Sequence, residues 1–425
     1  MFDRRLVVGG IILLTLGVVF GALLRLQPVS GSNDGSRWNT VWSLNTGHGY
    51  IVDEAPFGTV DKVRRDGHFY SSKPALLPTL LAGWAWVLKA TTGRAIPDQT
   101  GFVVRTTLVL LNLVPLAVFI FFYARLLDWL KCSPATQLYC LVAAALGTYL
   151  TGYSVTLNNH TLAAIGTFGA LYCYIRIRYD ARTQWHYFFS CGLLAAWAVA
   201  NEMVAVLLIL ILLGLLLRRH PSQTLKYFLP PAAVLGVAYL YTTYLSTGGL
   251  IPYYLYFNTP YYQYEGSYWT NPRGIDAAQE VKWLYLFHLT FGHHGIFSLT
   301  PIFLIAFYGL FQKGRISEIN RIGLLVSVVI IGFYTFKTNN YGGVCQGARW
   351  LFWLIPFWLI SMASVVEQYM QSRRFQVFAG LALFLSLMTT GFALSGSAEP
   401  NKGRPGPWSA SWLHLQMREA NWVDY

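Results

Sequence analysis

The sequence predicts an all-α, polytopic membrane protein in which residues 1–425 form a single domain. Two bulk observations favour this class: 55% of the residues are hydrophobic while only 12% are charged, and the mean hydropathy is +0.43. A soluble chain of this length would carry more charge. The third observation is a series of apolar runs, most of them close to the ~20 residues that cross a ~30 Å hydrocarbon core. We therefore predict about eleven transmembrane helices.

The net charge of +13 has two explanations. Nucleic-acid binding would require a basic run interleaved with aromatic residues in a soluble segment, and the sequence contains none. In a membrane protein, Lys and Arg gather in the cytoplasmic loops instead. We therefore expect membrane lipids, and no nucleic acid, as partners. The five cysteines form no C-x-x-C pair, which predicts neither a disulfide framework nor a zinc ribbon.

The first apolar run, Leu6–Leu24, follows a short basic start that includes Arg4 and Arg5. A cleaved signal peptide is the alternative explanation of this run. No small-x-small cleavage site follows it cleanly, which favours an uncleaved anchor. The two arginines then place the N-terminus inside and the first long loop outside.

The second apolar run, Ala75–Leu88, is short and contains Pro78. If it crossed the membrane, five later basic connections would lie opposite Arg4. If it lies in the interface, all five share the side of Arg4, as the positive-inside rule favours. We therefore predict an interfacial or re-entrant helix over residues 75–88. The five connections are Arg125–Lys131, Arg176–Arg182, Arg218–Lys226, Lys313–Arg321 and Arg373–Arg374.

The remaining boundaries follow from the apolar runs. The predicted spans are approximately 6–24, 103–124, 135–153, 159–176, 186–201, 203–217, 226–245, 295–312, 321–336, 348–366 and 376–394. The predicted outside segments are 25–102, 154–158, 201–202, 246–294, 337–347 and the tail 396–425.

The first outside loop is rich in ionisable residues and ends in a Lys73-Pro74 step. Asp34 lies about ten residues past the first span, where a carboxylate is suited to act as a general base toward an acceptor hydroxyl. Asp53, Glu54 and Asp66 compete for this role, and a solvated or salt-bridged carboxylate is the alternative for each of them.

Two short polar turns join predicted spans. In Asn158-Asn159-His160, the side chains either line a wet cavity or cap a helix. Glu202 lies where two apolar runs meet, and is either a functional acid or a solvated interfacial one.

Two later outside segments hold further candidates. His293 and His294 lie between glycines and, together with His160 and either Asp34 or Glu202, are candidate ligands for a divalent metal ion. Lys337 opens a Gly-rich stretch that ends at Arg349, whose guanidinium either holds a phosphate or extends to lipid headgroups. The tyrosines of 246–294 either form an interfacial cover or stack on sugar rings.

Three short motifs carry a resemblance. Asp34–Trp38 (DGSRW) has the place of an Asp-Glu-x-Arg-Tyr motif, Lys73–Ala75 (KPA) that of a Lys-Pro-Pro step, and Gly347–Trp350 (GARW) that of a late Gly-rich loop. In this respect the chain resembles the GT-C superfamily of polytopic glycosyltransferases. It is similar to protein O-mannosyltransferases, to the aminoarabinose transferases that modify lipid A, and to rhizobial lipopolysaccharide glycosyltransferases.

The resemblance implies an inverting glycosyltransferase of the bacterial cytoplasmic membrane, with its active site on the outer, periplasmic face. The donor would be a polyprenyl-phosphate-linked sugar, and the acceptor a lipid, a glycan or a protein. Asp34 would deprotonate the acceptor. Arg349, with Lys73 or Lys337, would neutralise the departing phosphate. Arg37 belongs to the first motif.

Two departures from the family pattern keep other functions open. Gly35 replaces the glutamate of the first motif, and Asn158 lies in a loop where relatives often carry another acid. One alternative is a non-catalytic relative that binds polyprenyl phosphate. Another is a transporter or flippase of lipid-linked sugars, which would be expected to show polar or broken spans and an internal repeat. We see no clear repeat.

Overall fold

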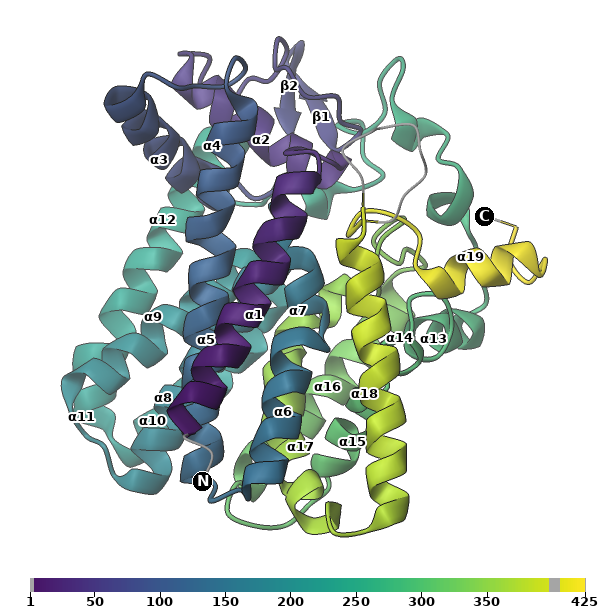
Figure 1. Cartoon of the computed structure of the whole chain (residues 1–425). Coiled ribbons are helices and arrows are strands. Elements are labelled where there is room, and N and C mark those ends of the chain that lie inside the picture. Colours follow the sequence, from purple (N-terminus) through teal and green to yellow (C-terminus); the bar gives the residue numbers. More distant parts are fainter. Residues whose placement is uncertain (1–3, 397–405, 425) are drawn as a thin grey trace.

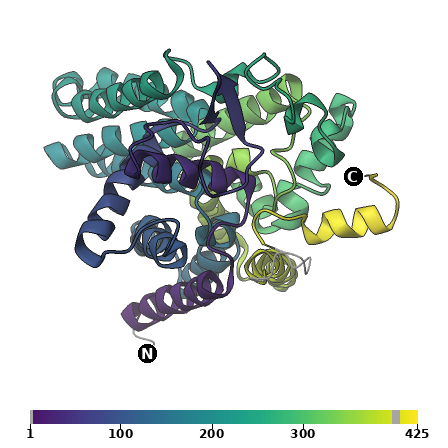
Figure 2. The same cartoon turned by 90° about the horizontal axis from the view of Figure 1, so that it is seen from above.

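The computed structural model of the chain describes residues 4–396 and 406–424. Long helices run side by side, and a small cap covers one end of the bundle (Figure 1). The cap contains the antiparallel strands β1 (Lys62–Arg65) and β2 (His68–Ser71), and we call this end of the bundle the hairpin end. Viewed from that end, α2 and the hairpin lie across the helix ends (Figure 2).

The first half of the chain supplies the cap and half of the bundle. Its helical elements are α1 (Arg4–Arg25), α2 (Ser32–Asn45), α3 (Leu76–Thr92), α4 (Thr100–Leu108), η1 (Val109–Leu113), α5 (Val114–Trp129), α6 (Pro134–Leu146), α7 (Tyr149–Gly152), η2 (Tyr153–Val155), α8 (His160–Asp180), α9 (Trp185–Asn201), η3 (Met203–Ala205), α10 (Val206–Arg219), α11 (Pro221–Gln223), η4 (Thr224–Phe228) and α12 (Leu229–Thr247).

The second half begins with an irregular segment and returns to long helices. Its helical elements are η5 (Tyr253–Tyr256), η6 (Tyr268–Thr270), η7 (Gly274–Ala277), α13 (Lys282–Thr290), α14 (Ile296–Leu299), α15 (Ile302–Gly309), α16 (Ser317–Lys337), η8 (Arg349–Leu354), α17 (Ile355–Tyr369), α18 (Arg373–Leu394) and α19 (Trp412–Glu419). The predicted tail 396–425 lies partly outside the described residues, at 397–405 and 425.

The chain is an all-α, multi-pass membrane protein, but the predicted count of eleven spans is not confirmed. Within the described residues, seven helical stretches are long and apolar enough to cross a membrane. Four predicted spans have no counterpart among them. Helix α8 is long enough, with 21 residues, but is not apolar enough, α9 and α10 have only 17 and 14 residues, and α14 and α15 are separate short helices. The seven stretches are Arg4–Arg25, Thr100–Trp129, Pro134–Val155, Pro221–Thr247, Ser317–Lys337, Arg349–Tyr369 and Arg373–Leu394.

Helix α3, which covers the predicted interfacial run, does not cross the bundle. It lies at the hairpin end, between the end of α2 and the start of α4 (Figure 1), and packs against both. Its Trp86 is 64% exposed, whereas Leu81 and Leu88 are buried. One face of α3 therefore packs on the protein. Its position in a membrane interface stays a prediction.

The hairpin was not expected from the sequence. Asp66 and Gly67 connect its strands, both with positive φ (54° and 88°). This is the conformation that two-residue hairpin turns require, and Asp-Gly favours it. Backbone hydrogen bonds then extend the pairing, because Val52 donates to Phe69 and Arg64 donates to Tyr261. The hairpin thereby joins the first polar loop to the tyrosine-rich segment.

The opposite end of the bundle collects the basic connections. Arg4 pairs with Asp128, Arg219 pairs with Glu318 at 2.9 Å, and the guanidinium of Arg315 donates to the carbonyl of Trp129. These contacts bring connections that are far apart in the sequence to one end of the molecule, as the charge argument expected. We call it the basic end.

Helix α17 lies at the centre of the bundle. It packs against α6, α8, α15 and α16, and every residue from Ile355 to Ala363 is buried. A helix that is apolar on all faces is suited to such a position. The five cysteines are free and buried, as is usual for cysteines that act as small apolar residues.

Candidate functional site

A cavity of about 590 Å³ lies at the hairpin end, of the size of a small-molecule site. Its walls combine the cap, the tyrosine-rich segment and the ends of membrane helices. The lining residues are Gly31, Ser32, Asn33, Arg37, Val60, Asp61, Ser72, Lys73, Pro74, Asn159, His160, Ala200, Asn201, Glu202, Met203, Val204, Tyr254, Leu255, Phe257, Tyr262, Tyr268, Trp269, Asp276, Phe333, Tyr334, Thr338, Asn340, Gly342, Gly343, Val344, Arg349, Trp350 and Trp408.

Three cations from distant parts of the sequence meet in this cavity: Arg37 on α2, Lys73 before α3, and Arg349 at the start of η8. The Nη2 of Arg349 donates to the carbonyl of Gly342 at 2.6 Å, and its guanidinium lies 5.0 Å from the ring centre of Trp408. Its Nε is buried and has no hydrogen-bond partner. The Nε–H of Arg349 is therefore an unused hydrogen-bond donor at the cavity wall.

The cations affect one another electrostatically. Burial lowers the pKa of Lys73 to about 8, with Asp61 opposing the shift and Arg37 and Arg349 adding to it. Burial likewise lowers the pKa of Arg37 to about 10, with Arg349 adding to the shift. Positive charges that repel one another in a buried site are stabilised by a bound anion. The cavity is thus suited to hold an anionic ligand.

A histidine–carboxylate pair lines the same cavity. His160 Nδ1 lies 2.7 Å from Glu202 Oε2, and His160 Nε2 lies 3.4 Å from Arg349 Nη1. Asn159 accepts from Arg37 at 2.5 Å and donates to the carbonyl of Asn201 at 2.6 Å. These bonds tie the start of α8 to α2 and to the end of α9.

Burial raises the pKa of Glu202 to about 8, and the charges of Arg349 and Arg37 oppose that shift. A carboxyl group with a pKa near the working pH is suited to proton transfer. Two further carboxyl groups line the cavity. Asp61 pairs with Lys73 at 2.9 Å, and burial raises the pKa of Asp276.

Asp34, the predicted base, lies in a different environment. It is fully buried and is absent from the described cavity lining. Its carboxylate accepts from the backbone N–H groups of Ser30, Gly31 and Gly35, and from the hydroxyl of Thr156 at 2.9 Å. Burial raises its pKa to about 6. The contacts around Asp34 are those of a residue that caps α2 and joins it to the 154–158 turn.

Four other predicted residues also lie away from the described cavity lining. Asn158 accepts from the backbone N–H of Thr161 at 2.9 Å, which is the capping arrangement. Lys337 is exposed at the end of α16. His293 and His294 are buried behind the Gly-rich stretch, and His294 Nε2 lies 3.1 Å from the carbonyl of Gly343.

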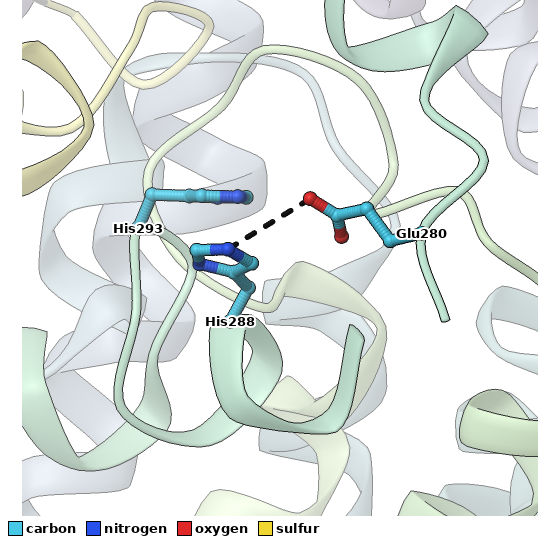
Figure 3. Close-up of side chains that lie close together, drawn as sticks. All are labelled: Glu280, His288 and His293. Atoms are coloured by element: carbon cyan, nitrogen blue, oxygen red, sulfur yellow. Dashed lines mark ion pairs between the residues drawn. The ribbon is translucent and has the colours of Figure 1, made fainter. Parts of the chain in front are cut away.

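Potential metal ligands gather away from His160. In the described part of the chain, the one group of three is Glu280, His288 and His293, whose ligand atoms lie within 4.8 Å of one another (Figure 3). The predicted grouping of His160 with His293 and His294 does not occur there. Instead, His160 pairs with Glu202.

Sequence reasoning missed several cavity residues. Tyr262, Trp269 and Trp408 line it, and the indole of Trp408 donates to Thr156 at 2.7 Å. The tail was predicted only as an outside segment, and the side chain of Gln346 donates to the carbonyls of Gly406 and Ala410 within it. The tyrosine-rich segment was nevertheless a candidate in the sequence, because stacking on sugar rings was one of the two interpretations of its tyrosines.

Comparisons of the chain with protein-family models and with curated proteins return no match.

Proposed function

We propose that this protein is a membrane-embedded glycosyltransferase that moves a sugar from a polyprenyl-phosphate-linked donor to a hydroxyl group of a lipid, glycan or protein acceptor. The observation that carries the proposal is the convergence of Arg37, Lys73 and Arg349 in one cavity at the end of a membrane helix bundle. A phosphate held there would be close to helices that can accommodate its lipid chain.

The apolar part of the cavity supports a lipid-linked donor. Phe333 and Tyr334 come from the membrane helix α16, and Met203 and Val204 precede α10. On the cap side, Tyr262 and Trp269 offer aromatic faces of the kind that stack on sugar rings. In this proposal the lipid lies toward the bundle, the phosphate lies at the cations, and the sugar lies under the cap.

The proposed transfer step forms one bond and breaks another. The acceptor oxygen forms a bond to the anomeric carbon, and the bond from that carbon to the phosphate oxygen breaks. Arg37, Lys73 and Arg349 stabilise the negative charge that develops on the departing phosphate. The acceptor proton passes to a carboxylate of the cavity wall. Glu202 is favoured over Asp34, because it lines the cavity and has the higher pKa.

Mass spectrometry of glycolipids and glycoproteins, from cells with and without the gene, tests the proposal. A sugar missing from one product class would identify the reaction. Complementation with Arg349→Lys should fail, because Lys cannot reproduce the guanidinium fork. The matched control is Arg94→Lys, at an exposed arginine that lies over Phe102 away from the cavity. Identical glycan profiles with and without the gene would overturn the proposal.

A further inference from the structure

A second polar cluster lies next to the Gly-rich stretch and is not used by the proposed transfer. Glu280 comes from the segment before α13, His288 from the last turn of α13, and His293 from the turn that follows. The two imidazole rings stack with their centres 4.2 Å apart, and the carboxylate of Glu280 lies beside them (Figure 3). Only 3% of His288 and none of His293 is exposed. Two buried imidazoles and one partly buried carboxylate, all groups with strong metal affinity, thus lie together.

His294 lies beside this group and connects it to the Gly-rich stretch. Its Nε2 lies 3.1 Å from the carbonyl of Gly343, which can only accept, so this nitrogen donates. Its Nδ1 lies 2.6 Å from His293 Nδ1. The ring of His293 is thereby linked through His294 to Gly343.

The surrounding residues orient the other two groups. His288 Nε2 lies 3.7 Å from Glu280 Oε1, while Glu280 Oε2 accepts from the hydroxyl of Tyr341. His288 Nδ1 is buried and has no hydrogen-bond partner. A Cβ added at Gly292 would collide with this Nδ1. Glycine at position 292 therefore lets the His288 ring occupy its present place.

We propose that Glu280, His288 and His293 bind one zinc-class divalent cation. Two imidazoles and one carboxylate suit Zn²⁺, whereas Mg²⁺ and Ca²⁺ prefer sets of oxygen ligands. Ligand atoms that share a zinc ion at ~2.1 Å lie roughly 3.4 Å apart. Since the present ligand atoms lie up to 4.8 Å apart, binding would draw them together by up to about 1.4 Å.

The cation would act on the position of the Gly-rich stretch and not on the substrate. Tyr341 binds Glu280, and the carbonyl of Gly343 binds His294. Between them, the carbonyl of Gly342 holds Arg349. A metal ion would thus fix the 280–294 segment against the residues that orient Arg349. This inference does not depend on the nature of the reaction.

Metal analysis of the purified full chain, loaded with Zn²⁺ and desalted after removal of any affinity tag, tests the site. We expect about one zinc per chain in the wild type, with at least a tenfold loss in His288→Gln. His68→Gln, at an exposed histidine paired with Asp53, is the matched control and should retain the metal. A wild type without zinc, or a His288→Gln variant that retains it, would overturn the proposal.

Should His288→Gln aggregate, Co²⁺ binding to the wild type keeps the proposal testable. Four- or five-coordinate Co²⁺ gives visible absorption bands, and these should appear at one equivalent and disappear when Zn²⁺ is added. Zn²⁺ should also raise the thermal unfolding temperature of the wild type. Bands that are absent, or that Zn²⁺ does not displace, would contradict the site.

Discussion

Asp34 receives four hydrogen bonds, three of them from backbone N–H groups that cannot become acceptors. Asp34→Asn replaces one acceptor oxygen by an NH₂ group, which must then face donors. The backbone cannot rotate to adapt. We expect a loss of about 1–3 kcal/mol in the free energy of unfolding, seen as a lower unfolding temperature in detergent. Transfer activity should fall no more than the folded fraction does.

For Glu202→Gln we expect the opposite: little change in stability but a large loss of turnover. Gln has nearly the shape of Glu and can still accept from His160, so the unfolding temperature should change little. If Glu202 is the base, the turnover rate should fall by about 10²–10⁴. A variant of Asp34 that folds like the wild type but has lost turnover would return the role of base to Asp34.

Lys73 makes ligand binding pH-dependent. Its pKa of about 8 lies below the ordinary value of 10.5, because burial disfavours the ammonium form. The protonated form binds an anion, so affinity is full below pH 8 and is lost as the pH rises through that value. For a polyprenyl-phosphate ligand we expect about a 25-fold rise in Kd between pH 7.5 and 9.5. Binding titrations in detergent would measure it.

Two variants separate the groups that titrate in this range. Lys73→Arg keeps its charge and should flatten the profile. Glu202 also titrates near pH 8, and its ionisation adds a negative charge that weakens anion binding. Glu202→Gln should therefore leave the contribution of Lys73 in place. An unchanged profile in Lys73→Arg would exclude Lys73 as the titrating group.

At the residue level, sequence reasoning succeeded where topology alone determines position. Arg37, Lys73, Glu202 and Arg349 were all predicted at one membrane surface, and all four line the cavity. Sequence reasoning failed where a hydrogen-bond network determines the role of a residue. The bond that joins Asp34 to the 154–158 turn comes from Thr156, 122 residues away, and no local pattern predicts that contact.

At the scale of elements, the Gly-rich stretch depends on Gly342. Its φ of +90° is unfavourable for any residue with a Cβ, and a Cβ there would lie 2.7 Å from Arg349 Nε. Gly342→Ala should therefore displace the guanidinium and add about 1–2 kcal/mol of backbone strain. We expect ligand affinity to fall at least tenfold in the binding titration, with the chain still inserted in the membrane.

Gly332→Ala on α16 is the matched control, because a Cβ at that position meets nothing within 4 Å. It should leave affinity unchanged and slightly favour the helix. Equal affinities in the wild type and Gly342→Ala would mean that Arg349 does not need its present position.

Long apolar helices were predictable because their length and hydropathy are local properties. The β1–β2 hairpin was missed because its strands are only four residues each, and their charged residues lack a clear alternation. The Asp66-Gly67 turn was its one local signal. The predicted count of eleven spans is not confirmed, because an apolar run does not reveal where a helix breaks, as at Leu299–Ile302 between α14 and α15.

At the scale of the whole molecule, the two ends of the bundle differ in chemistry. The basic end holds connections linked by Arg4, Arg219 and Arg315, whereas the hairpin end holds the cavity. In a membrane the basic end should face the cytoplasm. Helix α3 determines on which side every later connection lies. It begins and ends at the hairpin end (Figure 1), as a helix that does not cross the membrane would.

Cysteine labelling tests this orientation. The five native cysteines are buried, so an impermeant maleimide should report mainly on an added one. Thr91→Cys lies at the exposed end of α3, and Lys313→Cys lies in the exposed connection between α15 and α16. We expect Thr91→Cys to be labelled from outside intact cells, and Lys313→Cys only in inverted vesicles. Labelling of Thr91→Cys only in inverted vesicles, together with labelling of Lys313→Cys from outside, would mean that α3 spans the membrane, because one additional crossing moves Thr91 and every later connection to the other side.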